Sequence, residues 1–233
     1  MKILFTFLWI CSVARATMYP DDHFDFVTEI KDRDQLNELV NQAIKKSQTL
    51  FVRWVSDPDH ADCLRQAPTW NRAVRAFADN KKVVFGDINL SEADTLKGAP
   101  HWPSRYGWPT IRYFNRETGV DGADYEQKTN QKMHDELRDF DVMVDYIEKA
   151  GNTVLCDLNG KHCNKMEKDY IKLVKKKSLD ELILLRKRLY AMDVNLLVKD
   201  IQEWNLRRRR ILSKLVKQKE IKETGKSTTG NEL

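Results

Sequence analysis

The hydrophobic positions of the chain follow two different periods, and the change falls near residue 151. Upstream of it, short apolar runs rich in β-branched and aromatic residues alternate with segments that carry apolar side chains at helical spacing. This alternation predicts an α/β fold with a mixed or parallel sheet. The expected strands are 24–30, 49–55, 82–90, 110–115 and, at an edge, 123–128.

Three helices are expected between and after these strands. Asp34 can cap the first, which carries its apolar residues on one face. A second helix is expected to run through Trp70 and Phe77, and a third to span 140–151 and end at Gly151.

The strand pattern disappears in the C-terminal part of the chain. Apolar residues recur at helical spacing from Tyr170 to Trp204, and Ser178 followed by Glu181 forms a capping box. Residues 152–222 are therefore expected to form a small all-α domain behind an α/β domain that spans 17–151. Residues 223–233 are polar and are expected to be disordered.

The N-terminus has the features of a secretory signal peptide, residues 1–16. Lys2 precedes an apolar run, which ends in the small-x-small sequence Ala14-Arg15-Ala16. This run is too short to cross a bilayer comfortably, and no later stretch is long enough to do so. We therefore expect a cleaved signal and no membrane span, with an N-terminal anchor as the weaker interpretation.

Charge is distributed unevenly along the chain. Residues 161–222 hold 19 Lys and Arg against 8 Asp and Glu, whereas the whole chain is +5 and the remainder sums to −6. A basic domain can bind nucleic acid, but a secretory chain rarely meets any. The basic residues, including the run 207–210 that spreads around a helix, are therefore interpreted as solvated surface or as a patch for acidic partners.

Removal of the signal would leave three cysteines. Cys156 and Cys163 lie close together in CDLNGKHC and are expected to form a disulfide, which leaves Cys63 as a single thiol. A zinc site at the pair is the weaker alternative, because no second ligand pair stands at finger-like spacing. Neither a metal nor a cofactor is expected.

Residues 59–70 read DHADCLRQAPTW, and they contain one cysteine where a redox motif would have two. Together with VVFGDINL, YGWPTIRYF and VDYIEKAG, this segment resembles the thioredoxin-like domain of the protein disulfide isomerase family over roughly residues 24–151. The resemblance implies a thioredoxin-like mixed sheet flanked by helices. The layout is similar to the redox-inactive branch of the family, in which a helical domain follows.

The resemblance also assigns roles within His60-Ala61-Asp62-Cys63. His60 stands where the family has its attacking cysteine, and Cys63 stands where it has the resolving one. Disulfide exchange needs a thiolate and then a second thiol, so this site is expected to be degenerate. A monothiol isomerase in which His60 activates Cys63 is the alternative, and the question of enzymatic activity stays open.

At two neighbouring strand positions the charges are the reverse of those in the family. Arg53 replaces a buried glutamate, and Asp87 replaces the lysine that faces it, so the resemblance implies an ion pair with its charges exchanged. One partner alone would be a costly buried charge. The alternative is that Arg53 faces solvent.

Pro109 takes the place of the family's cis proline. It lies near Trp102, Tyr106 and Trp108, and the resemblance implies that these aromatic residues bind extended polypeptides beside the proline. For the tryptophans, a packing role is an equal alternative.

The chain ends in GNEL, which is similar to a retrieval signal of the Lys-Asp-Glu-Leu type. Asn231, Glu232 and Leu233 are therefore expected to bind a retrieval receptor, which predicts the endoplasmic-reticulum lumen, with secretion as the alternative. The expected function is a non-catalytic chaperone or escort that binds secretory client polypeptides, with homodimerisation left open. A secreted interaction protein is a further alternative.

Overall fold

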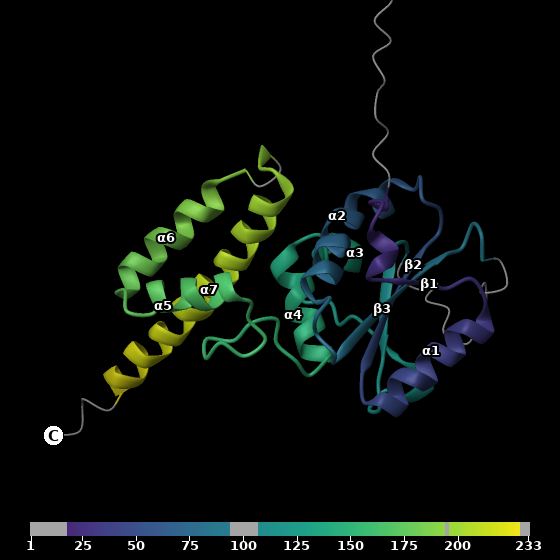
Figure 1. The fold of residues 1–233 in the computed structure, drawn as a ribbon, viewed down its shortest axis with the longest axis horizontal. Coiled ribbons are helices and arrows are strands. Elements are labelled where there is room, and N and C mark those ends of the chain that lie inside the picture. Colours follow the sequence, from purple (N-terminus) through teal and green to yellow (C-terminus); the bar gives the residue numbers. More distant parts are fainter. Residues whose placement is uncertain (1–17, 94–106, 194–195, 229–233) are drawn as a thin grey trace, which may run out of the picture.

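The computed structural model describes residues 18–93, 107–193 and 196–228 (Figure 1). Five strands form one mixed sheet in the order β1-β3-β2-β4-β5. β3 is parallel to both β1 and β2, whereas β4 is antiparallel to β2 and β5, which confirms the predicted mixed sheet. The strands are β1 (Thr28–Glu29), β2 (Thr49–Val55), β3 (Val83–Asn89), β4 (Thr110–Phe114) and β5 (Ala123–Asp124).

Helices cover both faces of the sheet, as Figure 1 shows. α1 (Arg33–Lys46) packs on one face, where Leu36 joins Leu50 in an apolar cluster. α2 (Ala61–Ala76) and α4 (Phe140–Ala150) cover the other, where Trp70 and Val144 share a core with Phe51. Short helices lie in the connections: η1 (His23–Asp25), η3 (Gly119–Asp121) and α3 (Met133–Glu136).

The start of the described chain differs from the sequence prediction. Residues 24–30, predicted as one strand, begin instead with η1, and only Thr28 and Glu29 pair with β3. The backbone amide of Phe26 turns back to the carbonyl of His23, so the alternation of apolar residues here does not reflect a sheet. The cap of α1 is Asp32 rather than Asp34, because the Asp32 side chain accepts a hydrogen bond from the Gln35 amide.

The C-terminal helices α5 (Lys165–Val174), α6 (Leu179–Ala191) and α7 (Lys199–Thr228) share a separate core that includes Leu182 and Leu212. The predicted capping box of Ser178 and Glu181 is present at the start of α6. α7 extends through residues 223–228, which were expected in the disordered tail; each residue added to an existing helix adds one backbone hydrogen bond. Within the described ranges, no helix is long and apolar enough to span a membrane.

Candidate functional site

The first turn of α2 carries the two residues of the degenerate motif. His60 is the exposed N-cap residue, and its side chain forms no capping hydrogen bond. Cys63, one turn further on, is completely buried and is not disulfide-bonded. A helix N-terminus favours a negatively charged group such as a thiolate. Here the residue at the helix terminus is His60, which carries an imidazole, and the thiol of Cys63 lies in the interior of the domain.

The surroundings of Cys63 are mainly apolar. Its side chain belongs to a small cluster with Met18, Val55 and Ala67, and Trp108 packs against this cluster. Burial raises the pKa of the Cys63 thiol, and the hydrogen bonds to Ser56 and the charge of Arg53 offset only part of that effect. The thiol is therefore protonated at neutral pH and closed to solvent, which makes it a poor nucleophile.

Beneath the motif, the structure brings Arg53 and Asp87 together. They are direct neighbours in the register of β2 and β3, and Arg53 Nη1 lies 3.7 Å from Asp87 Oδ2. The side chains are 0% and 2% exposed, so Arg53 does not face solvent. Arg53 Nη2 also donates a hydrogen bond of 3.0 Å to the carbonyl oxygen of Cys63. The ion pair is thus tied to the first turn of α2.

His23 is a third member of this buried group, and sequence reasoning missed it. Its Nε2 lies 2.9 Å from Asp87 Oδ2, and its ring stacks on Tyr19 at 4.7 Å. Burial, together with the charge of Asp87, raises the pKa of the Tyr19 hydroxyl and keeps it neutral. The sequence offers only a weak signal for this role, a lone histidine among acidic and aromatic residues ahead of a strand.

The expected peptide-binding residues fall at the start of β4. The Trp108–Pro109 peptide bond is cis, Pro109 is buried, and Trp108 is half-buried between the α1 face and the Cys63 cluster. Trp108 therefore has a packing role, and part of its ring remains accessible. Trp102 and Tyr106 lie outside the described residues.

No protein-family model matches the chain. A protein disulfide-isomerase-like protein of Emiliania huxleyi is 27% identical over 159 residues, which cover 67% of this chain and 65% of the relative. The order of the sheet and the cis proline give the chain a thioredoxin-like fold, as the sequence predicted. The match spans just under two thirds of the relative's own length.

Three solved structures are similar to parts of this thioredoxin-like protein. The J-Trx1 fragment of ERdj5 is 18% identical, with coverage of 57% of this chain and 55% of that one and a TM-score of 0.41. Human ERp44 in a zinc-bound form is 15% identical, with coverage of 54% and 27% and a TM-score of 0.35. A mutant thioredoxin from Halobacterium salinarum NRC-1 is 18% identical, with coverage of 56% and 95% and a TM-score of 0.35.

Cys156 and Cys163 form a disulfide in the segment that leads from α4 into α5, with their Cα atoms 4.5 Å apart. Both side chains belong to the core shared by α5, α6 and α7, which together form the helical unit. The carboxylate of Glu167 lies near the two sulfurs. Because the sulfurs are bonded to each other, they offer no thiolate to a metal, and we interpret the disulfide as structural.

The helical unit of this thioredoxin-like protein is joined to the sheet domain through α7, and sequence reasoning missed that contact. Arg210 is only 7% exposed and contacts Asp141, Asp145 and Glu148 of α4 at 2.9–3.1 Å. Burial alone would lower its pKa, but these carboxylates outweigh burial and raise it. The expectation of four solvated arginines is therefore wrong at Arg210. The side chain of Leu206 joins the core beneath α2 and α4.

Proposed function

We propose that this chain is a non-catalytic, thioredoxin-like binding protein that escorts secretory polypeptides in the lumen of the endoplasmic reticulum. The observation that carries the proposal is the division of the motif, with exposed His60 at the helix terminus and Cys63 fully buried. A disulfide-exchange cycle needs an accessible thiolate and a second thiol to resolve the mixed disulfide. An imidazole at the attacking position cannot form a mixed disulfide at all.

The proposed client surface is the accessible part of Trp108 beside the cis Pro109. An aromatic ring next to exposed backbone suits an extended chain, because the ring buries a large apolar area and the backbone can pair with the client. Cys63 packs behind Trp108 and supports it from within. In this proposal the segment from His60 to Cys63 has a structural role and no redox role.

The proposed location rests on the sequence at both ends. The signal-like N-terminus supports entry into the secretory pathway, and the final Asn231, Glu232 and Leu233 support retrieval to the endoplasmic reticulum. Removal of the last four residues is expected to release the protein into the culture medium. Full retention of the truncated protein in cells would contradict the retrieval role.

The decisive experiment compares Cys63→Ser with Trp108→Ala in two assays. Aggregation of a reduced, denatured secretory protein measures client binding, and reactivation of scrambled ribonuclease measures isomerase activity. We expect Cys63→Ser to leave aggregation suppression unchanged and Trp108→Ala to reduce it. Leu173→Ala is the matched control, because Leu173 is an exposed apolar residue on α5, 68% accessible and outside the sheet domain that carries the motif.

The same experiment tests the alternative of a monothiol isomerase. If the wild-type protein reactivates scrambled ribonuclease and Cys63→Ser abolishes that activity, the non-catalytic proposal is wrong. If Leu173→Ala reduces aggregation suppression as much as Trp108→Ala does, client binding is not located beside Pro109.

A further inference from the structure

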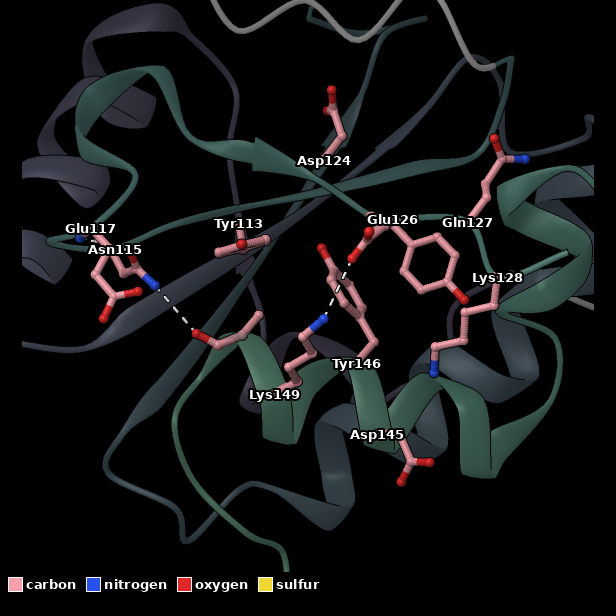
Figure 2. A pocket seen from close by; sticks show the side chains of 12 residues that line it. Tyr113, Asn115, Glu117, Asp124, Glu126, Gln127, Lys128, Asp145, Tyr146 and Lys149 are labelled. Atoms are coloured by element: carbon pink, nitrogen blue, oxygen red, sulfur yellow. Dashed lines mark hydrogen bonds and ion pairs between the residues drawn. The ribbon is translucent and has the colours of Figure 1, made fainter.

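A cavity of about 580 Å³ opens between α4 and the edge of the sheet at β4 and β5 (Figure 2). Its volume lies within the range of ligand sites, which is about 300–1,000 Å³. Trp108 and Pro109 precede the first residue of β4, whereas the cavity lies at the other end of that strand, beside Tyr113 and Asn115. It is therefore separate from the proposed client surface.

Three tyrosines supply the aromatic lining. The ring of Tyr146 meets Tyr125 at 5.0 Å and Tyr113 at 6.0 Å, both edge-to-face. Tyr146 is only 7% exposed, and in the described part of the chain its hydroxyl has no hydrogen-bond partner. Burial raises the pKa of this hydroxyl and keeps it neutral. A buried polar group without a partner is costly, so the hydroxyl can gain from a ligand that hydrogen-bonds to it.

Acidic and basic side chains both line the cavity, and the pairing of two carboxylates with arginines outside it leaves the two signs in balance. Asp124 is paired with Arg112 at 2.8 Å, and Asp145 is paired with Arg210 at 2.9 Å, so both are already neutralised by partners outside the cavity. Glu126 instead faces Lys149. The lining contains four carboxylates against two ammonium groups: Glu117, Asp124, Glu126 and Asp145 against Lys128 and Lys149.

Lys149 and Glu126, which both line the cavity, form an ion pair. The ammonium of Lys149 lies 3.4 Å from Glu126 Oε2, and Figure 2 shows this pair extending from α4 to the loop after β5, in front of Tyr146. The two side chains are 81% and 85% exposed, and an ion pair so exposed is weak and easily exchanged. Lys149 thus holds its ammonium group beside Glu126 at the exposed rim of the cavity.

We propose that this cavity binds a basic side chain, arginine or lysine, of an extended polypeptide. The incoming cation replaces Lys149 at Glu126, and its apolar stem lies against the tyrosine rings, where cation–π attraction adds to the charge. A polypeptide suits the site because β5 is the edge strand, to which an extended chain can be added. The identification of this polypeptide as a client rests on the proposed function. The preference for a cation is independent of that function.

The test uses Nα-acetyl-arginine amide as the probe and Nα-acetyl-citrulline amide as its neutral isostere, with binding to the full chain followed by NMR titration. We expect saturable, millimolar binding of the arginine probe and none of the citrulline probe. Lys149→Met is expected to tighten binding about two- to fivefold, because it removes the competing cation. Glu126→Gln is expected to weaken binding by a similar factor.

Lys165→Met is the matched control, because Lys165 forms an exposed ion pair with Asp169 on α5, away from the cavity. It should leave binding unchanged. Equal binding of the two probes, or no effect of Lys149→Met and Glu126→Gln, overturns the cation site. A short extended peptide with a central arginine should bind more tightly than the amide probe, and equal affinity overturns the assignment to polypeptides.

The outcomes separate this site from the proposed function. Arginine-selective binding without aggregation suppression would contradict the escort role and leave the cation site standing. Aggregation suppression that survives in Glu126→Gln, in a protein that shows no arginine-selective binding, would contradict the cation site alone.

Discussion

The guanidinium of Arg53 donates a hydrogen bond of 3.0 Å from Nη2 to the main-chain carbonyl of Cys63. The same guanidinium lies 3.7 Å from the carboxylate of Asp87 on the neighbouring strand. One buried cation therefore connects two strands of the sheet to the first turn of α2. It fixes the orientation of that turn, and with it the position of Cys63 behind Trp108.

The first prediction concerns this buried charge. Arg53→Met should lower the free energy of unfolding by about 3–5 kcal/mol, because the buried carboxylate of Asp87 then loses its arginine counter-charge. Urea denaturation measures the loss. The double variant Arg53→Met, Asp87→Leu should be more stable than the single one, because both charges are then removed. A double variant no more stable than Arg53→Met would show that the two residues are not coupled.

The second prediction restores the missing thiol. His60→Cys places a cysteine at the N-cap of α2, where the helix terminus lowers the pKa of a thiol. We expect it to form a disulfide with Cys63 under an oxidising glutathione buffer, seen by alkylation and mass spectrometry, and to bring measurable oxidase activity. His60→Ser is the control that keeps a small polar residue without a thiol. A cysteine at this position that remained fully alkylatable would mean that Cys63 is too deeply buried to react.

The sheet could be predicted because its information is local. The runs at 49–55, 82–90 and 110–115 appear as β2, β3 and β4, and the resemblance then indicated which residues of two strands are neighbours. Arg53 and Asp87 are aligned in that register. The strand predicted at 24–30 was wrong for most of its length. The backbone amides around η1 form hydrogen-bonded turns, which an alternating hydrophobic pattern does not reveal.

The rest of the site depends on contacts between distant segments. His23 meets Asp87 across 64 positions of sequence, and no spacing rule links them. The four consecutive arginines all look alike in sequence. Which one is buried depends on the rotation of α7 against α4, a property of the assembled fold, and here it selects Arg210.

The third prediction tests that contact between the two units. Arg210→Met should lower the free energy of unfolding by about 1.5–3 kcal/mol, because it removes charged hydrogen bonds to α4 that are largely shielded from solvent. Arg208→Met is the matched control on the same helix. Arg208 lies over the ring of Trp204 at 5.5 Å, and its loss should cost less, about 0.5–1 kcal/mol. Equal losses in urea denaturation would contradict a specific role for Arg210 in joining the units.

The fourth prediction concerns acid. Glu136, the last residue of α3, is buried, and it accepts hydrogen bonds from the Tyr125 hydroxyl at 2.7 Å and from the Lys128 amide at 3.0 Å. Burial opposes its ionisation, but these bonds, with those from Thr129, outweigh burial and lower its pKa from 4.5 to about 2. A folded-state pKa below the unfolded value stabilises the fold above about pH 4.5, and this stabilisation is lost as the pH falls towards 2.

Glu136→Gln should therefore reduce stability at pH 7 and flatten the dependence of stability on pH between 4.5 and 2. Urea denaturation at several pH values in this window measures both effects. Glu38→Gln is the control for the loss of one negative charge, because Glu38 is exposed on α1. If the glutamine variant kept the wild-type slope, the acid sensitivity of the fold would have to come from another carboxylate. If it lost the slope, the loop between β5 and α3 would be the segment whose stability the proton controls.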